Sequence, residues 1–153
     1  MPKAERPKFP SSYGIAESSE GQLDWSWAVE RLSASRNYWI VTADANGRPH
    51  AAPVWGLWFD DALVFGTSPE SRKAKNLIRD PRVVVHLESG DEVVILEGKI
   101  ERGPIDDDIA DIYKEKYDFR PEPGDGWFWL RPSSALAWTE SEYPKTATRF
   151  SFD

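Results

Sequence analysis

Short strand-forming runs separated by tight turns are the feature that most constrains the fold of this 153-residue chain. Runs rich in β-branched and aromatic residues recur at short intervals, with Asp, Asn, Gly and Pro between them. The expected strands are residues 38–42, 50–59, 62–67, 83–87, 92–102, 126–131, 135–138 and 147–152. The expected helices are only three, near residues 24–32, 71–80 and 105–117. A doubly wound parallel sheet needs a helix after most strands, so the pattern predicts a mainly β fold, a closed or nearly closed antiparallel barrel.

Composition divides the chain into two parts. Residues 1–22 are rich in Pro, Ser and charged residues, which favours a flexible N-terminal arm, and residues 23–153 are expected to form a single domain. The chain has no cysteine and therefore no disulfide, which fits a reducing cytoplasm, and its first residues lack the apolar core of a signal peptide. No run approaches the ~20 apolar residues of a membrane span. We therefore expect a cytoplasmic protein.

Charge and residue types exclude several classes of function. The net charge of −7 opposes nucleic-acid binding, because affinity for a phosphate backbone comes mainly from Lys and Arg. The only histidines, His50 and His86, are far apart and have no cysteine partners, so no metal site is expected. No glycine-rich dinucleotide loop, Walker-type lysine loop or nucleophile elbow is present. We therefore assign no catalytic side chain, which suits chemistry carried by a cofactor.

Ser71, Arg72 and Lys73 indicate an anion site at the beginning of a helix. With Ser71 as the N-cap, two cations lie where the helix dipole already places partial positive charge, which is unfavourable unless an anion is bound. The free N–H groups of the first turn, the Ser hydroxyl and both cations would converge on a phosphate. The alternative is a solvated basic face on a surface helix.

The segment before this helix reads as a hairpin. The first strand covers His50–Phe59, Asp60-Asp61 form the turn, and the second strand, ending at Thr67, leads directly into the anion loop. Pro53 gives no ladder hydrogen bond, and Ala52 and Gly56 carry little or no side chain, so a flat ring could lie along the exposed backbone. An edge strand with a bulge is the alternative, and the sequence does not separate the two.

The order of four motifs resembles the pyridoxamine 5'-phosphate oxidase-like split-barrel superfamily, which binds FMN and includes the deazaflavin-dependent reductases. The motifs are Gly47-Arg-Pro-His-Ala-Ala-Pro-Val54, Phe65-Gly-Thr67, Ser71-Arg-Lys73 and Asp80-Pro-Arg-Val83. The resemblance implies a six-stranded antiparallel split barrel of Greek-key type and a homodimer with the flavin between subunits. It also implies roles for residues of three segments. The cofactor-binding residues would be Ala52, Pro53, Val54, Trp55, Gly56 and Leu57 beside the ring, Gly66 and Thr67 near the ribityl chain, and Ser71, Arg72 and Lys73 at the phosphate.

Four further residues are candidates for a substrate pocket over the ring: His50, Trp127, Trp138 and Arg149. Eight tryptophans are many for this length, and the default for each is the barrel core or a dimer interface. For His50 the alternative is a surface position at the end of a strand. For Arg149 it is a surface salt bridge.

Departures from the oxidase pattern decide which branch of the superfamily we expect. By this matching, the oxidases have Arg and Lys where this chain has Ala52 and Leu57, and Gln where it has Val93. Oxidation of vitamin B6 is therefore not expected. A less cationic trough resembles the deazaflavin branch, so we expect hydride transfer between reduced coenzyme F-420 and a small apolar conjugated acceptor. The alternatives are an FMN-dependent oxidoreductase of the same fold and a non-catalytic cofactor- or ligand-binding barrel.

Overall fold

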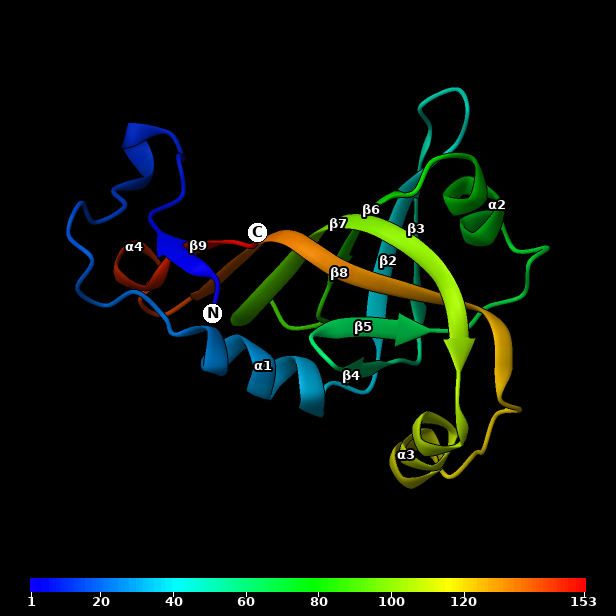
Figure 1. The fold of residues 1–153 in the computed structure, drawn as a ribbon. Coiled ribbons are helices and arrows are strands. Elements are labelled where there is room, and N and C mark those ends of the chain that lie inside the picture. Colours follow the sequence, from blue (N-terminus) through cyan, green and yellow to red (C-terminus); the bar gives the residue numbers. More distant parts are fainter.

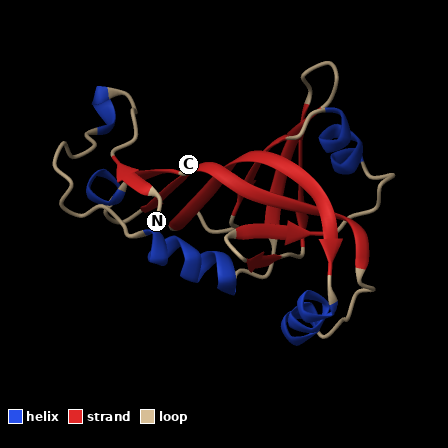
Figure 2. Cartoon of the chain, in the orientation of Figure 1, coloured by secondary structure: helices blue, strands red, loops and turns tan.

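The computed structural model describes residues 1–153 as one strongly curved antiparallel sheet with helices at its periphery (Figures 1 and 2). Its strands are β1 (Lys3–Glu5), β2 (Tyr38–Ala43), β3 (Pro49–Val54), β4 (Leu57–Phe59), β5 (Ala62–Phe65), β6 (Arg82–His86), β7 (Glu92–Ile105), β8 (Gly124–Thr139) and β9 (Thr148–Ser151). Its helices are α1 (Trp25–Ala34), α2 (Arg72–Arg79), α3 (Asp107–Tyr117) and α4 (Tyr143–Thr146), with a 3-10 turn at Ser11–Tyr13. The mainly antiparallel β architecture expected from the sequence is confirmed.

The sheet runs in the order β1-β9-β8-β7-β6-β2-β3, and β5 joins it through β8 and carries β4. The two longest strands, β7 and β8, cross the whole molecule side by side (Figure 1). On its other edge β8 pairs with β5 at residues 128–130 and with β9 at residues 134–137. β3 is therefore a free edge at one end of the strand order, and β1 lies at the other end.

Turn chemistry fixes two of the hairpins as the sequence indicates. Asp60 and Asp61 both have positive φ, 51° and 58°, as a two-residue hairpin turn requires. In the β2–β3 turn, Asp44 accepts hydrogen bonds from the N–H groups of Asn46 and Arg48 at 2.8 and 2.9 Å, and Gly47 takes a φ of 79°. The β2–β3 turn sets the register that aligns Thr42 with His50.

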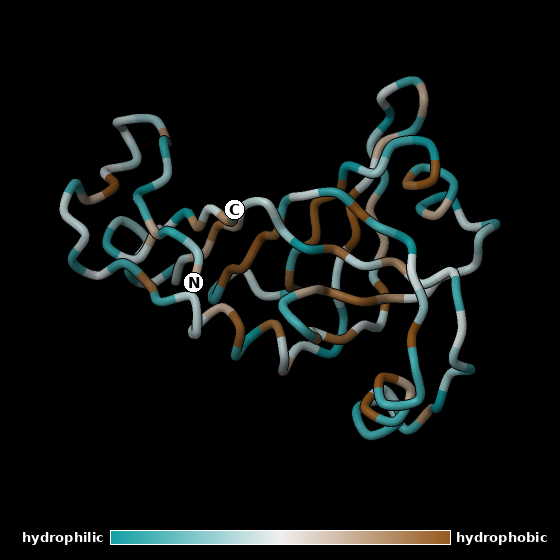
Figure 3. The backbone as a smooth tube through the Cα atoms, viewed as in Figure 1, coloured by the Kyte–Doolittle hydropathy of each residue, from teal (hydrophilic) through white to brown (hydrophobic).

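The hydrophobic core fills the inside of the barrel and continues under α3. Figure 3 shows the apolar segments concentrated between the curved strands. The larger cluster joins Trp25, Ala28 and Leu32 of α1 to the inward faces of β2, β6, β7 and β8. A second cluster packs α3 against β4 and β5, with members Leu57, Ala62, Val64, Ile105, Ile109, Ala110, Tyr113 and Tyr117.

The structure differs from the sequence-based boundaries in three places. The strand expected over residues 50–59 is broken into β3 and β4 at Trp55 and Gly56. β8 is continuous through Pro132, because the ladder changes register opposite the Glu97/Gly98 bulge and the missing N–H falls at that irregularity. Gly103-Pro104 does not end β7, so α3 begins at Asp107, with Asp106 as an N-cap that accepts the N–H of Ile109 at 2.9 Å.

The N-terminal segment makes specific contacts that its composition did not indicate. β1 pairs with β9, and Arg6 donates hydrogen bonds of 2.7–2.9 Å to four backbone carbonyls. The ring of Phe9 packs on those of Tyr143 and Trp138. The separation of this segment as a flexible arm stays a prediction. No helix is long and apolar enough to cross a membrane, and no three His, Cys, Asp or Glu side chains are grouped as a metal would require.

Candidate functional site

The beginning of α2 has the geometry that the sequence indicates for an anion site. Ser71 is the N-cap: it has extended backbone geometry, and its hydroxyl oxygen accepts the N–H of Ala74 at 3.3 Å. The same hydroxyl lies 3.3 Å from that of Thr67, which ties the end of the β5 loop to the helix. No acidic residue occupies the first turn. The positive end of the helix is therefore not compensated from within the helix.

Two cations and two backbone donors at this helix end have no partner within the chain. The N–H groups of Arg72 and Lys73 make no hydrogen bond, and neither side chain forms a salt bridge. Arg72 is exposed and Lys73 half-buried. The hydrogen bond from the N–H of Arg48 lowers the pKa of Asp44, and the charge of Arg72 contributes a smaller effect. Unsatisfied donors and cations of this kind fit a phosphate group.

Gly66, just before this loop, lies directly against the indole of Trp127. A Cβ atom at Gly66 would stand 3.1 Å from two ring carbons of Trp127, so any larger residue would displace the indole. The structure thereby brings together Gly66 and Trp127, which the sequence proposed separately as cofactor and pocket residues. Trp127 comes from the beginning of β8, where β8 runs past the end of β5.

β3 presents a free edge beside this region, but the residues after it are less open than the sequence suggested. Ala52 and Val54 are half-buried, and Pro53 and Trp55 are exposed. The backbone of Gly56, in contrast, is buried and already paired. The side chain of Leu57 is 4% exposed and lies in the core cluster under α3, so it does not line an open trough.

α3 supplies the groups that pair with Gly56. The hydroxyl of Tyr117 accepts the N–H of Gly56 at 2.9 Å, and the carbonyl of Gly56 accepts a hydrogen bond from Lys116 at 2.9 Å. Lys116 also donates to the hydroxyl of Tyr38 at 2.8 Å. Burial, followed by the positive charge of Arg36, lowers the pKa of Lys116 to about 8. These contacts lock the corner between β3 and β4.

An aromatic row links this corner to Gly66. Trp55 stacks on Tyr117 with ring centroids 4.6 Å apart, Tyr117 lies 4.8 Å from Tyr113, and Tyr113 meets Trp127 edge-on at 5.6 Å. Such edge and offset contacts stabilise by about 0.5–1.5 kcal/mol each beyond the area they bury. The row is rigid and apolar, as a wall beside a planar ligand should be.

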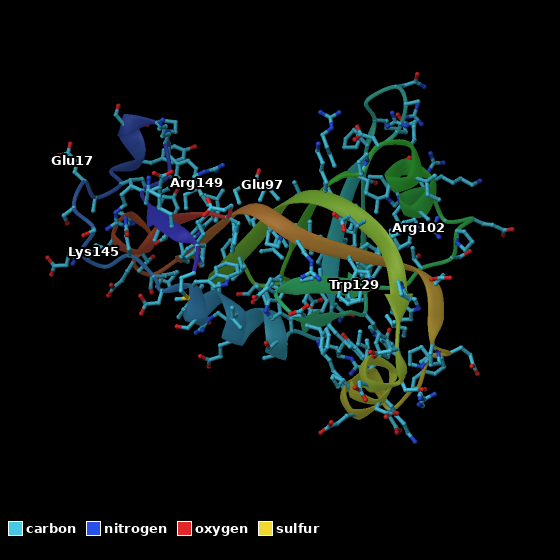
Figure 4. All side chains as sticks on the ribbon, in the orientation of Figure 1. Glu17, Glu97, Arg102, Trp129, Lys145 and Arg149 are labelled. Carbon is cyan, nitrogen blue, oxygen red and sulfur yellow. The ribbon has the colours of Figure 1, made fainter.

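The remaining pocket candidates are divided between the two ends of the sheet. His50 is the second residue of the edge strand β3, and the Nδ1 atom of its ring is buried without a hydrogen-bond partner. Trp138 packs on Phe9 and Tyr143, and Arg149 lies 3.7 Å from Glu97 in an ion pair. Figure 1 shows β9 and α4 on one side of the molecule and α2 on the other, and Figure 4 shows Arg149 on the side of β9. Within one chain, Trp138 and Arg149 are therefore not brought to the phosphate helix.

Comparison with known proteins shows the family. Residues 28–139 match the pyridoxamine 5'-phosphate oxidase family. The chain belongs to this family. A pyridoxine/pyridoxamine 5'-phosphate oxidase from Acidothermus cellulolyticus is 29% identical over an alignment of 119 positions, and the alignment covers 72% of this chain and 50% of that protein. The chain thus spans about half the length of that curated relative.

Solved structures show the split-barrel fold of this family. A conserved hypothetical protein from Mycobacterium tuberculosis aligns with a TM-score of 0.64 at 22% identity, covering 76% of this chain and 85% of that one. A structure described as an F-420 reductase aligns with a TM-score of 0.56 at 19% identity, covering 69% of this chain and 93% of that one. At identities this low the structural alignments establish the fold alone, and they confirm the mainly β split barrel.

Sequence reasoning missed Arg36, Lys116, Tyr113 and Tyr117. The three α3 residues read as ordinary members of an amphipathic helix, and no motif marks them. Their role depends on how α3 packs against the β3–β4 corner, where Gly56 lies 60 positions from Lys116 and 61 from Tyr117 along the chain. The only signal in the sequence for this contact was Lys116, a polar residue at the end of an otherwise apolar face of α3.

Lys116 should make the free energy of unfolding depend on pH. The folded chain releases its proton near pH 8 and the unfolded chain only near the ordinary value of 10.5, so stability rises with pH between these values. The buried tyrosines oppose this above pH 10, because burial raises the pKa values of Tyr38, Tyr113 and Tyr117. We expect the rise between pH 8 and 10 to disappear in Lys116→Met, measured by urea unfolding.

Lys114→Met is the matched control, since Lys114 is exposed on the same helix. A control variant that lost the rise to the same extent, or a Lys116→Met variant that kept it, would assign the effect to other groups.

Proposed function

We propose that this chain is a homodimeric oxidoreductase that uses reduced coenzyme F-420 to deliver hydride to a small conjugated acceptor, with FMN as the alternative cofactor. The observation that carries the proposal is the uncompensated beginning of α2. Ser71 caps the helix, Arg72 and Lys73 have no acidic partner, and two N–H groups are free beside Thr67. Family membership supports a flavin-type cofactor at this place.

The residues of this chain would hold, orient and shield the cofactor. Arg72, Lys73 and the free N–H groups bind the phosphate, and Thr67 and Gly66 border the linker that follows it. The free edge of β3 would border the ring, and Trp127 fixes the surface against which Gly66 packs. The bound cofactor supplies the hydride chemistry, so the protein needs no catalytic side chain of its own.

The preference for the deazaflavin rests on what the β3–β4 segment lacks. Ala52 brings no cation to the ring, and Leu57 is directed into the core instead of the trough. The similarity to a structure described as an F-420 reductase agrees with this preference, although at 19% identity it carries only the fold.

The dimer is proposed from the outer face of the sheet. Alternate residues of neighbouring strands form one largely apolar surface there, half-buried except for the exposed Ala51 and Pro53. It consists of Trp39 and Val41 of β2, Ala51 and Pro53 of β3, Val84 and His86 of β6 and Ile95 of β7. Soluble monomers rarely expose large contiguous apolar patches, so a surface of this kind favours a partner. Pairing of two such faces around a two-fold axis would cover it.

A second function is a barrel that binds the cofactor or another small ligand without turnover. The lack of an assigned catalytic side chain fits this function equally well. Reduced cofactor mixed with a panel of enones and quinones separates the two, because only an enzyme accelerates the change in cofactor absorbance.

Arg72 and Lys73 should be required for cofactor binding. Replacing both by Ala removes two charge-assisted interactions that contribute roughly 1.5–3 kcal/mol each. We expect affinity for F-420 and for FMN to fall by several orders of magnitude in fluorescence titration. Lys75→Ala serves as the control, since Lys75 lies one turn further along α2 and is exposed. Unchanged affinity in a folded double variant would remove the phosphate site.

The cofactor itself should be distinguishable by colour and air stability. An expression host that makes FMN but no deazaflavin should yield colourless protein, because the β3–β4 segment offers the FMN ring no cation. Added F-420 should then bind more tightly than added FMN. Yellow protein with stoichiometric FMN, measured by absorbance after denaturation, would reverse the order of the two cofactors.

Light scattering at micromolar concentration should give the mass of a dimer. Val84→Arg places a charge in the middle of the outer apolar face, where burial without a partner is costly. We expect this variant to be monomeric, folded by circular dichroism and weak in cofactor binding. A monomeric parent protein would contradict the shared site.

A further inference from the structure

Arg36 and Lys116 are two cations that share one aromatic neighbour and have no acidic partner. The Arg36 guanidinium lies 5.5 Å from the ring centroid of Tyr117, and the Lys116 ammonium lies 5.1 Å from it. No salt bridge of the structure includes either residue. Two like charges near the same ring repel each other. The chain has a net charge of −7, yet no acidic side chain is paired with either cation.

Both cations retain unused hydrogen-bond donors. Lys116 uses two of its three N–H groups, on Tyr38 and on the carbonyl of Gly56. The side chain of Arg36 is exposed and donates no hydrogen bond within the chain, although its backbone carbonyl accepts one from Tyr117. A ligand with acceptor oxygens would find donors on both residues.

A flat apolar surface lies beside this pair. The indole of Trp55 is 37% exposed and is held by its stacking on Tyr117, at an interplanar angle of 8°. The guanidinium of Arg36 stands 5.3 Å from the centroid of the same indole. An exposed aromatic ring with a cation close to it can stack a planar molecule and bind its charged substituent.

The carboxylates of the neighbourhood do not neutralise this pair. Glu115 precedes Lys116 on α3, and Glu88 and Asp91 line a hollow on the other side of Arg36, shared with Ser35 and Ser89. None of these carboxylates comes within 4.0 Å of a nitrogen of Arg36 or Lys116. The positive charge is therefore available to a ligand.

We infer that Trp55, Arg36 and Lys116 form a subsite for a planar anion, a conjugated carboxylate or enolate, at the end of β3 away from the phosphate helix. The inference rests on the proposed function, since it defines the chemistry taken at the ring end of the same strand. Both cations come from outside the β3–β4 segment: Arg36 from the residues before β2 and Lys116 from α3. The anion belongs either to the acceptor or to the reduced ring of the cofactor.

The subsite is tested with 2-naphthoate as the probe, titrated by calorimetry into protein free of cofactor. Its neutral counterpart, 2-naphthylmethanol, has the same ring and no charge. We expect naphthoate to bind the parent protein and the alcohol to bind more weakly. Arg36→Gln and Lys116→Met should each weaken naphthoate binding roughly tenfold to a hundredfold, with little effect on the alcohol.

Controls separate this subsite from folding and from the phosphate site. Arg36→Gln changes an exposed side chain without hydrogen bonds, so it tests the subsite even if Lys116→Met fails to fold. Lys114→Met should bind naphthoate as the parent does. The Arg72→Ala/Lys73→Ala variant should also retain naphthoate binding, so failure at α2 and failure at Trp55 are distinguishable. Equal affinity for acid and alcohol, or unchanged affinity in folded Arg36→Gln, would overturn the inference.

Repeating the titration with bound cofactor identifies the source of the anion. If the acceptor provides it, naphthoate binds together with reduced F-420 or FMN in a ternary complex. If the reduced ring provides it, naphthoate competes with the reduced cofactor, and Arg36→Gln weakens the reduced form more than the oxidised form. Either result supports the subsite. Naphthoate affinity that changes neither in Arg36→Gln nor on addition of cofactor would contradict it.

Discussion

The pairing of β7 with β8 is the interaction on which the rest of the fold depends. The ladder runs from the Glu92–Thr139 pair to the Ile105–Gly124 pair. The other edge of β8 is shared between two strands, β5 and β9. The change of partner is possible because Pro132 has no N–H to leave unpaired and Gly98 opposes it. A Cβ atom at Gly98 would stand 2.9 Å from the Leu130 side chain and 3.2 Å from backbone atoms of Arg131 and Ser133, so a larger residue would force its neighbours to shift. The end of β5 is thereby placed against the beginning of β8, which puts Gly66 under Trp127.

Much of the fold could be predicted from the sequence because its strongest signals are local. The Asp60-Asp61 turn, the capping of α2 by Ser71 and the apolar face of α1 depend on residues only a few positions apart. The same locality explains the errors. Whether Gly103-Pro104 ends a strand depends on the partner strand, and β7 continues because the beginning of β8 lies beside it. The docking of residues 3–5 on β9 is equally non-local.

The candidate site shows the same division. Ser71, Arg72 and Lys73 follow one another along the chain, so their convergence on a helix end could be read directly. The corner that holds Trp55 depends on α3, whose Lys116 and Tyr117 meet Gly56 only through the tertiary fold. The expectation that Gly56 and Leu57 face a ligand was made without that helix. In the structure α3 satisfies the backbone of Gly56 and buries Leu57, which leaves Trp55 as the exposed residue of the corner.

The two uncompensated cation pairs lie near opposite ends of one strand, and this spacing limits what can satisfy both. β3 covers six residues, Pro49–Val54, and an extended strand of that length spans roughly 17–20 Å. A simple phosphate or a simple aromatic acid reaches only one end. A ligand with a phosphate, a flexible linker and a fused ring can lie along the whole edge, with its charged ring or a stacked anionic acceptor at Trp55. Neither pair forms a salt bridge, although the chain has seven more negative than positive side chains. Under the proposed function, their separation along a free strand edge makes them the two ends of a single elongated site.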